Sequence, residues 1–188
     1  LSYGIFNLHY KEGKLSTLTG VDIIDPLINI KEDLKKITTA FYLIKLITQV
    51  LKDTQDPKIY DLFISTILKI NEGFDETVLC NILEIKLLPF LGVTLCLDGC
   101  IRCGSKKEIV TIDASYGGLI CKNCYRNEQI IDLRVVKLLR MYYYIDIGSI
   151  ESIKVDAKLK KIINKFLTDY YDSFTGLYLD KKVLEFKE

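Results

Sequence analysis

Apolar residues along this chain follow two different periods, and the change from one to the other predicts the order of its elements. Tyr3 to Tyr10 alternates loosely between apolar and polar side chains, and after a turn at Gly13 so does Lys14 to Val21, which is typical of two short strands. From Ile30 to about Leu51 apolar residues recur at helical spacing instead. Two strands alone are marginal in water, so we expect this pair to belong to a sheet whose other strands lie upstream.

Two more helices are predicted directly after the first. The next one begins at Pro57, whose missing N–H costs nothing in a first turn, and it ends at Asn71. The third runs from Asp75 to about Leu88. Because three consecutive helices are joined by short links, we expect a helical bundle.

The remaining predicted elements are two short strands followed by two long helices. Strands are predicted at Ile109 to Ile112 and Gly117 to Ile120, and helices at Arg134 to Tyr143 and Val155 to Phe174, the last closed by Gly176. The fold class we predict is therefore mostly α, with a small strand-bearing insertion between helical segments.

Four cysteines carry the strongest chemical signal in the chain. Cys100-x-x-Cys103 and Cys121-x-x-Cys124 are separated by seventeen residues, a spacing typical of zinc sites. Four thiolates complete a tetrahedron around Zn²⁺ and leave no position for a substrate, so we predict a structural site. Gly104 would let the backbone fold tightly under the metal. We interpret this segment as a zinc ribbon, with ordinary buried thiols or disulfides as the alternative.

Two further cysteines need separate explanations. Cys96 lies four residues before Cys100 and is the alternative ligand at that corner of the site. We prefer Cys100 because its pair is the one followed by Gly104. Cys80 falls on the apolar face of the third predicted helix, where we expect it to be part of the core.

Composition and charge narrow the class of protein. A chain of 188 residues with 49% hydrophobic content can bury one core and a small satellite domain. The net charge is +1, so any nucleic-acid binding must be local. Apolar stretches are too short to span a bilayer. Cysteines in metal spacing without a secretory leader predict a cytoplasmic protein, and a start at Leu1 inside a strand pattern predicts a fragment.

Catalysis finds little support in the sequence. His9 is the only histidine, and it lies in a predicted strand away from any carboxylate cluster. The chain has neither a phosphate-binding loop nor a Gly-x-Ser-x-Gly motif. A zinc deaminase would need a glutamate beside an open site, which four cysteines do not offer. We therefore expect a protein that is not an enzyme.

A specific resemblance covers roughly Leu88 to Cys124. Its parts are a helix that ends in Leu91-Gly92, the run Cys100-Ile-Arg-Cys103-Gly104, Gly117-Gly118-Leu119 and the second cysteine pair. In this order they resemble the RecO family of bacterial DNA repair proteins. The resemblance implies four segments: closing strands of an OB-fold in residues 1–29, the first part of a helical domain in 30–95, a zinc ribbon in 96–126, and the second part of the helical domain in 127–188.

The resemblance also implies a function and partners. Members of this family bind single- and double-stranded DNA, anneal complementary strands, and work with RecR and the single-strand-binding protein to load RecA. By this resemblance the chain would be a recombination mediator with a structural Zn²⁺. Its mechanism would be to hold DNA and protein partners together.

Basic side chains offer two candidate contact surfaces. The first is the ribbon, with Arg102, Lys106, Lys107, Lys122 and Arg126. Three acidic residues in the ribbon leave a surplus of two positive charges, which a tetrathiolate zinc centre of formal charge minus two would cancel. These residues are therefore candidates for individual phosphate contacts only, and a plain solvated surface is the alternative.

The second candidate surface is a lysine stripe. Lys154, Lys158, Lys161 and Lys165 lie at i, i+4, i+7 and i+11, which predicts one cationic helix face opposite an apolar one. It would contact DNA phosphates or the acidic tail of the single-strand-binding protein, and the alternative is an ordinary solvated face. Tyr142, Tyr143 and Tyr144 could stack on bases, but we expect them to pack the bundle and keep their hydroxyls in water.

Two functions from other classes stay open at this point. The Cys-x-x-Cys-Gly pair also resembles the iron site of rubredoxin-like electron carriers, whose ferric tetrathiolate is coloured whereas a zinc site is not. A zinc-ribbon adaptor that binds only proteins is the other alternative. It would show no binding to single-stranded DNA, whereas phosphate contacts produce a binding constant that falls steeply with salt.

Overall fold

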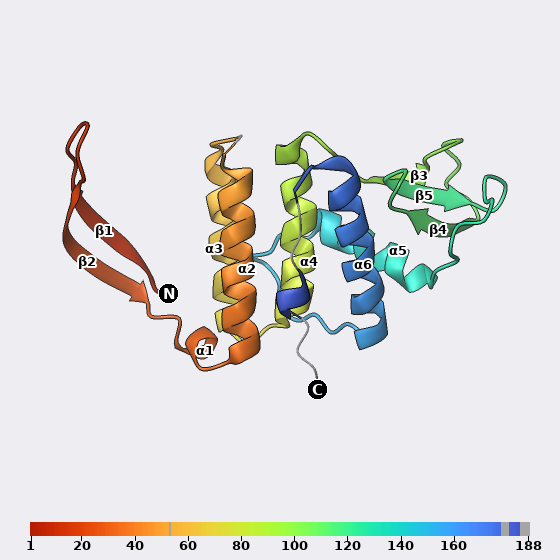
Figure 1. Cartoon of the computed structure of the whole chain (residues 1–188). Helices are drawn as coiled ribbons and strands as arrows, with labels where there is room; N and C mark the ends of the chain where they lie inside the picture. Colours follow the sequence, from red (N-terminus) through yellow and green to blue (C-terminus); the bar gives the residue numbers. More distant parts are fainter. Residues whose placement is uncertain (53, 178–180, 185–188) are drawn as a thin grey trace.

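The computed structural model describes residues 1–52, 54–177 and 181–184 of the chain (Figure 1). Its elements, in chain order, are β1 (Tyr3–His9), β2 (Thr17–Asp25), α1 (Ile28–Lys31), α2 (Leu34–Val50), α3 (Pro57–Asn71), α4 (Glu76–Leu87), the 3-10 helix η1 (Leu88–Leu91), β3 (Cys96–Cys100), β4 (Ile109–Asp113), β5 (Gly118–Cys121), α5 (Leu133–Tyr144), α6 (Ala157–Phe174) and the 3-10 helix η2 (Lys181–Leu184). Helices with two small sheets are thus confirmed. None of the helices in the described residues is long and apolar enough to cross a membrane.

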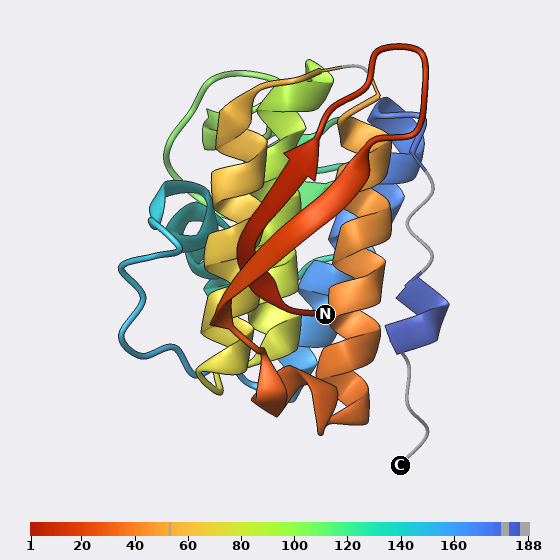
Figure 2. The same cartoon turned by 90° about the vertical axis from the view of Figure 1, so that its left-hand side faces the viewer.

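The first sheet is a hairpin that stands apart from the helices (Figure 1), and in the view of Figure 2 it lies in front of α2 and α3. β1 and β2 pair antiparallel, with Phe6 opposite Val21. The second strand begins and ends later than its pattern predicts, at Thr17 and Asp25. Phe6 and its neighbour Ile5 point to opposite faces of the strand and are both more than half exposed, at 52% and 57%. Neither face of the hairpin is therefore covered.

Aspartates set where the long helices begin. The side chains of Asp33, Asp56, Asp75, Asp132 and Asp156 each accept hydrogen bonds from backbone N–H groups in the first turn of α2, α3, α4, α5 and α6. Pro57 occupies the first turn of α3 as predicted. The single helix predicted from Ile30 to Leu51 is wrong at its start, because the cap at Asp33 separates α1 from α2.

Helix α4 lies in the middle of the bundle, with α2, α3 and α6 packed around it (Figure 1). Nine of its twelve residues are buried, Cys80 among them, as predicted for that thiol. Glu84 is also buried, with 0% exposure. Tyr42 donates to its Oε1 at 2.7 Å, and Lys181 donates to its Oε2 at 2.6 Å. Its backbone oxygen accepts from the Tyr171 hydroxyl, so one residue joins α2, α4, α6 and η2.

The second sheet is the ribbon, and it shares its core with the bundle. Its strands have the order β3-β5-β4, with β3 parallel to β5 and β4 antiparallel to β5. Leu97 and Leu119 belong to the same hydrophobic cluster as the helices. Arg140 Nε donates to the Leu97 oxygen at 2.8 Å, and the Tyr170 hydroxyl donates to the Thr94 oxygen at 3.0 Å. The ribbon is therefore an insertion in sequence but is docked on α5 and α6 in space.

Close packing also fixes the edge of the ribbon nearest α6. Gly117 has φ +68°, a left-handed conformation that favours glycine. A Cβ atom at this position would lie 2.7 Å from Cε2 of Tyr170. Only a residue without a side chain lets the aromatic ring of α6 approach the ribbon this closely.

Replacing Lys181 by methionine should lower the free energy of unfolding by about 3 kcal/mol, because the Glu84 carboxylate would be left buried without its cation. Urea unfolding followed by circular dichroism measures the change. Lys161→Met, at an exposed position on α6, is the matched control and should change little. The double variant Glu84→Gln/Lys181→Met should recover most of the loss. Equal stability of Lys181→Met and the parent chain would show that this ion pair does not hold η2 on the bundle.

Candidate metal centre

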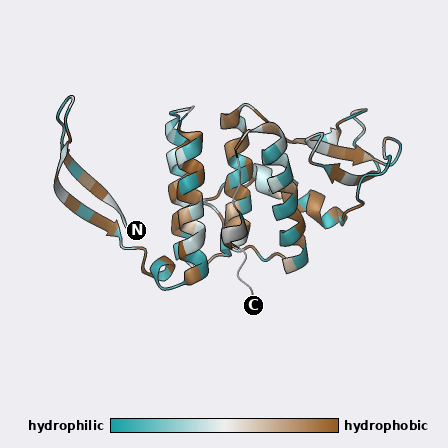
Figure 3. Ribbon diagram, viewed as in Figure 1, coloured by the Kyte–Doolittle hydropathy of each residue, from teal (hydrophilic) through white to brown (hydrophobic). Residues whose placement is uncertain are grey.

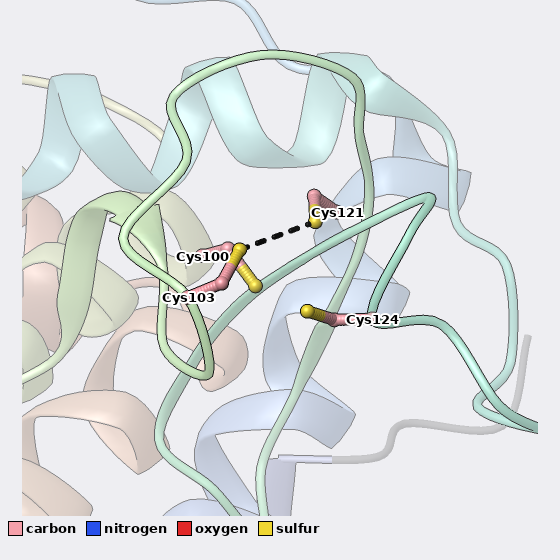
Figure 4. Close-up of side chains that lie close together, drawn as sticks. All are labelled: Cys100, Cys103, Cys121 and Cys124. Carbon is pink, nitrogen blue, oxygen red and sulfur yellow. Dashed lines mark hydrogen bonds between the residues drawn. The ribbon is translucent and has the colours of Figure 1, made fainter.

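Four sulfur atoms meet beside the end of the ribbon sheet (Figure 4). Cys100 ends β3 and Cys121 ends β5, and each is followed by a turn that carries the second cysteine of its pair. Because β3 and β5 are parallel, both turns emerge at the same end of the sheet. The Sγ atoms of Cys100, Cys103, Cys121 and Cys124 all lie within 4.8 Å of one another. The Sγ atoms of Cys103 and Cys121 lie 3.7 Å apart.

The backbone of both turns is tied by short hydrogen bonds. Gly104 N–H donates to the Cys100 oxygen at 2.7 Å, and Cys124 N–H donates to the Cys121 oxygen at 3.0 Å. Gly104 has φ +74°, so the tight backbone expected after the first pair is present and favours glycine. Each turn therefore folds back on itself and presents both of its sulfurs to the same point.

Burial and charge differ among the four thiols. Cys100 and Cys121 are buried, Cys124 is half-buried and Cys103 is exposed. Burial acts to raise the pKa of Cys100, but the backbone N–H groups of Cys121, Arg102 and Cys103 outweigh it and lower this pKa to about 6. The hydrogen bond with Cys103, followed by burial, raises the pKa of Cys124 to about 12. Without a cation, one of the four cysteines therefore loses its proton easily, whereas forming all four thiolates together is opposed.

The donor set fits a soft or borderline-soft cation. All four donors are sulfur, and a divalent ion would let the four thiolates form side by side, which their mutual repulsion opposes. These four cysteines could therefore hold one metal ion. Cys96 lies outside the group: it begins β3, and its Sγ lies 3.6 Å from the Gly99 oxygen.

Of the five basic residues of the ribbon, one is held by contacts within the protein and four are exposed. Arg102 donates to the Cys124 oxygen and to Glu128 Oε1, the latter at 2.6 Å, and its guanidinium lies 4.6 Å from the centre of the Tyr116 ring. These contacts occupy the side chain that the sequence marked as a phosphate contact. The exposed residues are Lys106, Lys107, Lys122 and Arg126.

The lysine stripe is shorter than its spacing predicts. Lys158, Lys161 and Lys165 are exposed on α6, but Lys154 precedes the Asp156 cap and is not on the helix. Placing Lys154 in the stripe is therefore wrong, because the helical period continues past the residue at which the helix begins. Lys154 instead lines a hollow together with the segment from Glu72 to Asp75.

Two lysines of α6, one of them in the stripe, have their charge partly neutralised by aspartates. Lys165 pairs with Asp169 at 2.7 Å on the exposed surface, a contact worth little in water. Lys160, which the stripe did not include, donates to Asp75 at 2.6 Å and joins α6 to the start of α4. Lys158 and Lys161 take part in none of the ion pairs found among the described residues.

The three consecutive tyrosines divide between core and surface. Tyr142 is fully buried, as expected for bundle packing, but its hydroxyl has no hydrogen-bond partner among the described residues, so the expectation of a solvated hydroxyl is wrong there. Tyr144 is 67% exposed and donates to Asp98 at 3.3 Å. Of the three, Tyr144 has the ring that is open to solvent.

Comparisons with known proteins agree on one family. A family model described as "Recombination protein O C terminal" matches residues 31–182. A protein named DNA repair protein RecO from Bacillus pumilus (strain SAFR-032) is 29% identical over 184 residues, which cover 96% of this chain and 72% of the relative. A protein of the same name from Listeria monocytogenes serotype 4b (strain CLIP80459) is 30% identical over 183 residues, covering 95% and 71%.

Cys100→Ser and Cys124→Ser should each lose most of the metal that the parent chain carries and should melt at a lower temperature, because metal binding energy at such a site is also folding energy. Inductively coupled plasma mass spectrometry of the purified chains, with thermal melts beside it, measures both effects. Cys96→Ser and Cys80→Ser are the matched controls and should keep the metal content of the parent. A full equivalent of metal in Cys100→Ser, or its loss in Cys96→Ser, would overturn this ligand set.

Proposed function

The chain belongs to the RecO family, and from that premise we propose that it serves DNA repair and homologous recombination as a mediator rather than as an enzyme. The observation that carries the proposal is the extent of the family match, which includes α2 to α6, the whole ribbon and both cysteine pairs. The relatives that align with nearly the whole chain are named DNA repair protein RecO.

The proposed activity is to hold DNA strands and protein partners together. In this role the chain binds single- and double-stranded DNA, anneals complementary strands, and helps RecR and the single-strand-binding protein to load RecA. What supports a binding role is the character of the built site: four cysteines offer a closed sulfur cage, and such a cage has no open position for a reacting group. His9 is exposed on β1, away from this site.

The proposed cofactor is one structural Zn²⁺, held by Cys100, Cys103, Cys121 and Cys124. When bound, the ion supplies a fixed tetrahedral junction and neutralises thiolate charge. The chain's own residues do the rest. The turn hydrogen bonds aim the sulfurs at one point, and the docking of the ribbon on α5 and α6 fixes where its exposed lysines lie relative to the bundle.

The proposed DNA contacts are the basic side chains that the structure leaves exposed. On α6 the exposed lysines are Lys158, Lys161 and Lys165, and Lys158 and Lys161 are the two that take part in none of the ion pairs found among the described residues. On the ribbon they are Lys106, Lys107, Lys122 and Arg126. Phosphate contacts from such residues give sequence-independent affinity, which is what strand annealing requires. The acidic tail of the single-strand-binding protein would bind to the same basic side chains.

The hairpin is proposed to be the closing pair of strands of an OB-fold. Figure 3 shows hydrophobic residues along both strands, although the hairpin lies apart from the bundle. Ile5, Phe6, Leu8, Ile23 and Ile24 are each more than half exposed. Exposed apolar residues on both faces of a two-stranded sheet support further strands as its natural cover.

Changing Lys158 and Lys161 together to glutamate should weaken binding to single-stranded DNA and flatten the dependence of log K on log salt by about two units, one for each lost phosphate contact. Fluorescence anisotropy across a salt series measures both quantities. Lys45→Glu/Lys58→Glu, exposed on α2 and α3, removes the same charge elsewhere and is the control. If both double variants behave alike, the effect is global charge. If the parent chain shows no salt-dependent binding, the protein-only adaptor replaces the proposed function.

Replacing Ile5 and Phe6 together by threonine should reduce self-association of the chain without changing its helix content, because both side chains are exposed on a strand where threonine is well tolerated. Sedimentation velocity measures the association state, and far-ultraviolet circular dichroism measures the helix content. A parent chain that is already a well-behaved monomer would count against the hairpin as part of a larger sheet.

A further inference from the structure

Arg102 crosses the metal centre from one cysteine turn to the other. It lies between Cys100 and Cys103 in the first turn, yet its Nη1 donates to the backbone oxygen of Cys124 in the second turn. Its Nη2 donates to Glu128 Oε1 at 2.6 Å, in the segment that leads to α5. One side chain therefore touches the second turn and the exit from the ribbon together.

The partners of this guanidinium are themselves fixed. The second carboxylate oxygen of Glu128 accepts from Arg126 N–H at 2.8 Å, so the acceptor is oriented before Arg102 reaches it. The Tyr116 ring, from the connection between β4 and β5, lies under the guanidinium at 4.6 Å. The side chain of Arg102 is only 18% exposed and that of Glu128 only 9%. These contacts make a preorganised clamp rather than a loose surface pair.

The chemistry of arginine suits this position in two ways. Its planar fork can bond a carbonyl and a carboxylate at once while stacking on a ring, which the single ammonium of lysine cannot do. Its fixed positive charge also lies in the turn that carries two of the four sulfurs. A tetrathiolate around a divalent ion has a formal charge of minus two, so a nearby cation stabilises the loaded centre.

We propose that Arg102 is the positioning residue of the metal centre: it holds the Cys121–Cys124 turn against the first turn and offsets part of the charge of the loaded site. Groups that orient metal ligands without touching the metal commonly change affinity by about ten- to a hundredfold. The inference rests on the metal site proposed above. It replaces the interpretation of Arg102 as a phosphate contact, because its guanidinium already donates to the Cys124 oxygen and to the Glu128 carboxylate.

The test is the rate at which the zinc-loaded full chain gives up its metal to a chromophoric chelator. Arg102→Gln should release zinc about ten- to a hundredfold faster than the parent. Arg102→Lys should lie between them, because it keeps the charge and loses the fork. Arg126→Gln is the matched control: this arginine is exposed in the same ribbon, and only its backbone N–H touches Glu128.

A spectroscopic signature separates positioning from a general loss of stability. With Co²⁺ in place of zinc, the d–d bands report the geometry of the sulfur ligands, and Arg102→Gln should shift them while Arg126→Gln leaves them unchanged. Should Arg102→Gln fail to fold, Arg102→Lys and Glu128→Gln decide, since each removes part of the clamp and should speed zinc release.

The outcomes distinguish the two proposals. A parent chain that takes up no metal overturns the metal site itself. A parent chain that holds zinc while Arg102→Gln, Arg102→Lys and Glu128→Gln all release it at the parental rate overturns the clamp alone and leaves the four-cysteine site standing. Faster release with an unchanged cobalt spectrum would also overturn positioning, because the ligand geometry would not depend on Arg102.

Discussion

Four sulfur atoms brought to one point are the constraint on which the ribbon depends. Its strands are short, with five, five and four residues. β3 and β5 pair at only two positions, Cys96 with Gly118 and Cys100 with Leu119, and an irregularity separates them. Such a sheet cannot by itself fix the two turns that follow it. Backbone hydrogen bonds tie each turn, and Arg102 joins one turn to the other. A cation among the four thiolates would remove the repulsion that opposes their meeting at one point.

The constraint extends from the sulfurs into the helices. Leu119 lies on β5, two residues before Cys121 and paired with Cys100 of β3, and it is part of the common core. Tyr170 on α6 donates to Thr94, which leads into β3, and packs beside Gly117, while Arg140 on α5 donates to the Leu97 oxygen. Loosening of the two cysteine turns would therefore weaken the contacts that the ribbon makes with α5 and α6. A metal far from any reacting group can matter for function in this way, by fixing the arrangement of a binding surface.

The bundle has its own constraint at the middle of α4. The Glu84 carboxylate is buried, and it accepts from Tyr42 on α2, from the Cys80 thiol on α4 and from its one cation, Lys181 on η2. Burial, followed by the charge of Glu84, raises the pKa of Tyr42 well above its usual range, so this hydroxyl stays a donor. A buried polar group needs particular partners, so it specifies which helices meet around it. Apolar side chains can pack against many partners and are less selective.

Local patterns in the sequence predicted the features that are themselves local. Asp56 and Asp75 mark helix starts because the capping side chain and the capped N–H groups are only two or three residues apart. The two cysteine pairs were found for the same reason. β3 was missed, since a strand rich in cysteine and glycine shows no alternation and its parallel partner is distant in sequence. Asp33 was read as helix interior because the apolar period continues across it.

Features that depend on distant partners escaped the sequence analysis. Arg102 resembles any surface arginine until Glu128, 26 residues away, is seen beside it. The role of Lys181 likewise depends on its ion pair with Glu84, which lies 97 residues earlier in the chain. A single sequence gives residue types and spacings but not these pairings. Resemblance to a family supplied the function, while the engaged and exposed states of the basic residues came only from the structure.

The central claim is that four thiolates of one chain enclose a single zinc ion. X-ray absorption at the zinc edge, on the purified chain with its metal content measured in parallel, tests it most directly because it counts ligand types around the metal. The account predicts one zinc per chain with four sulfur neighbours at about 2.3 Å and no lighter ligand. Nitrogen or oxygen neighbours at about 2.0 Å, or iron in place of zinc, would contradict it.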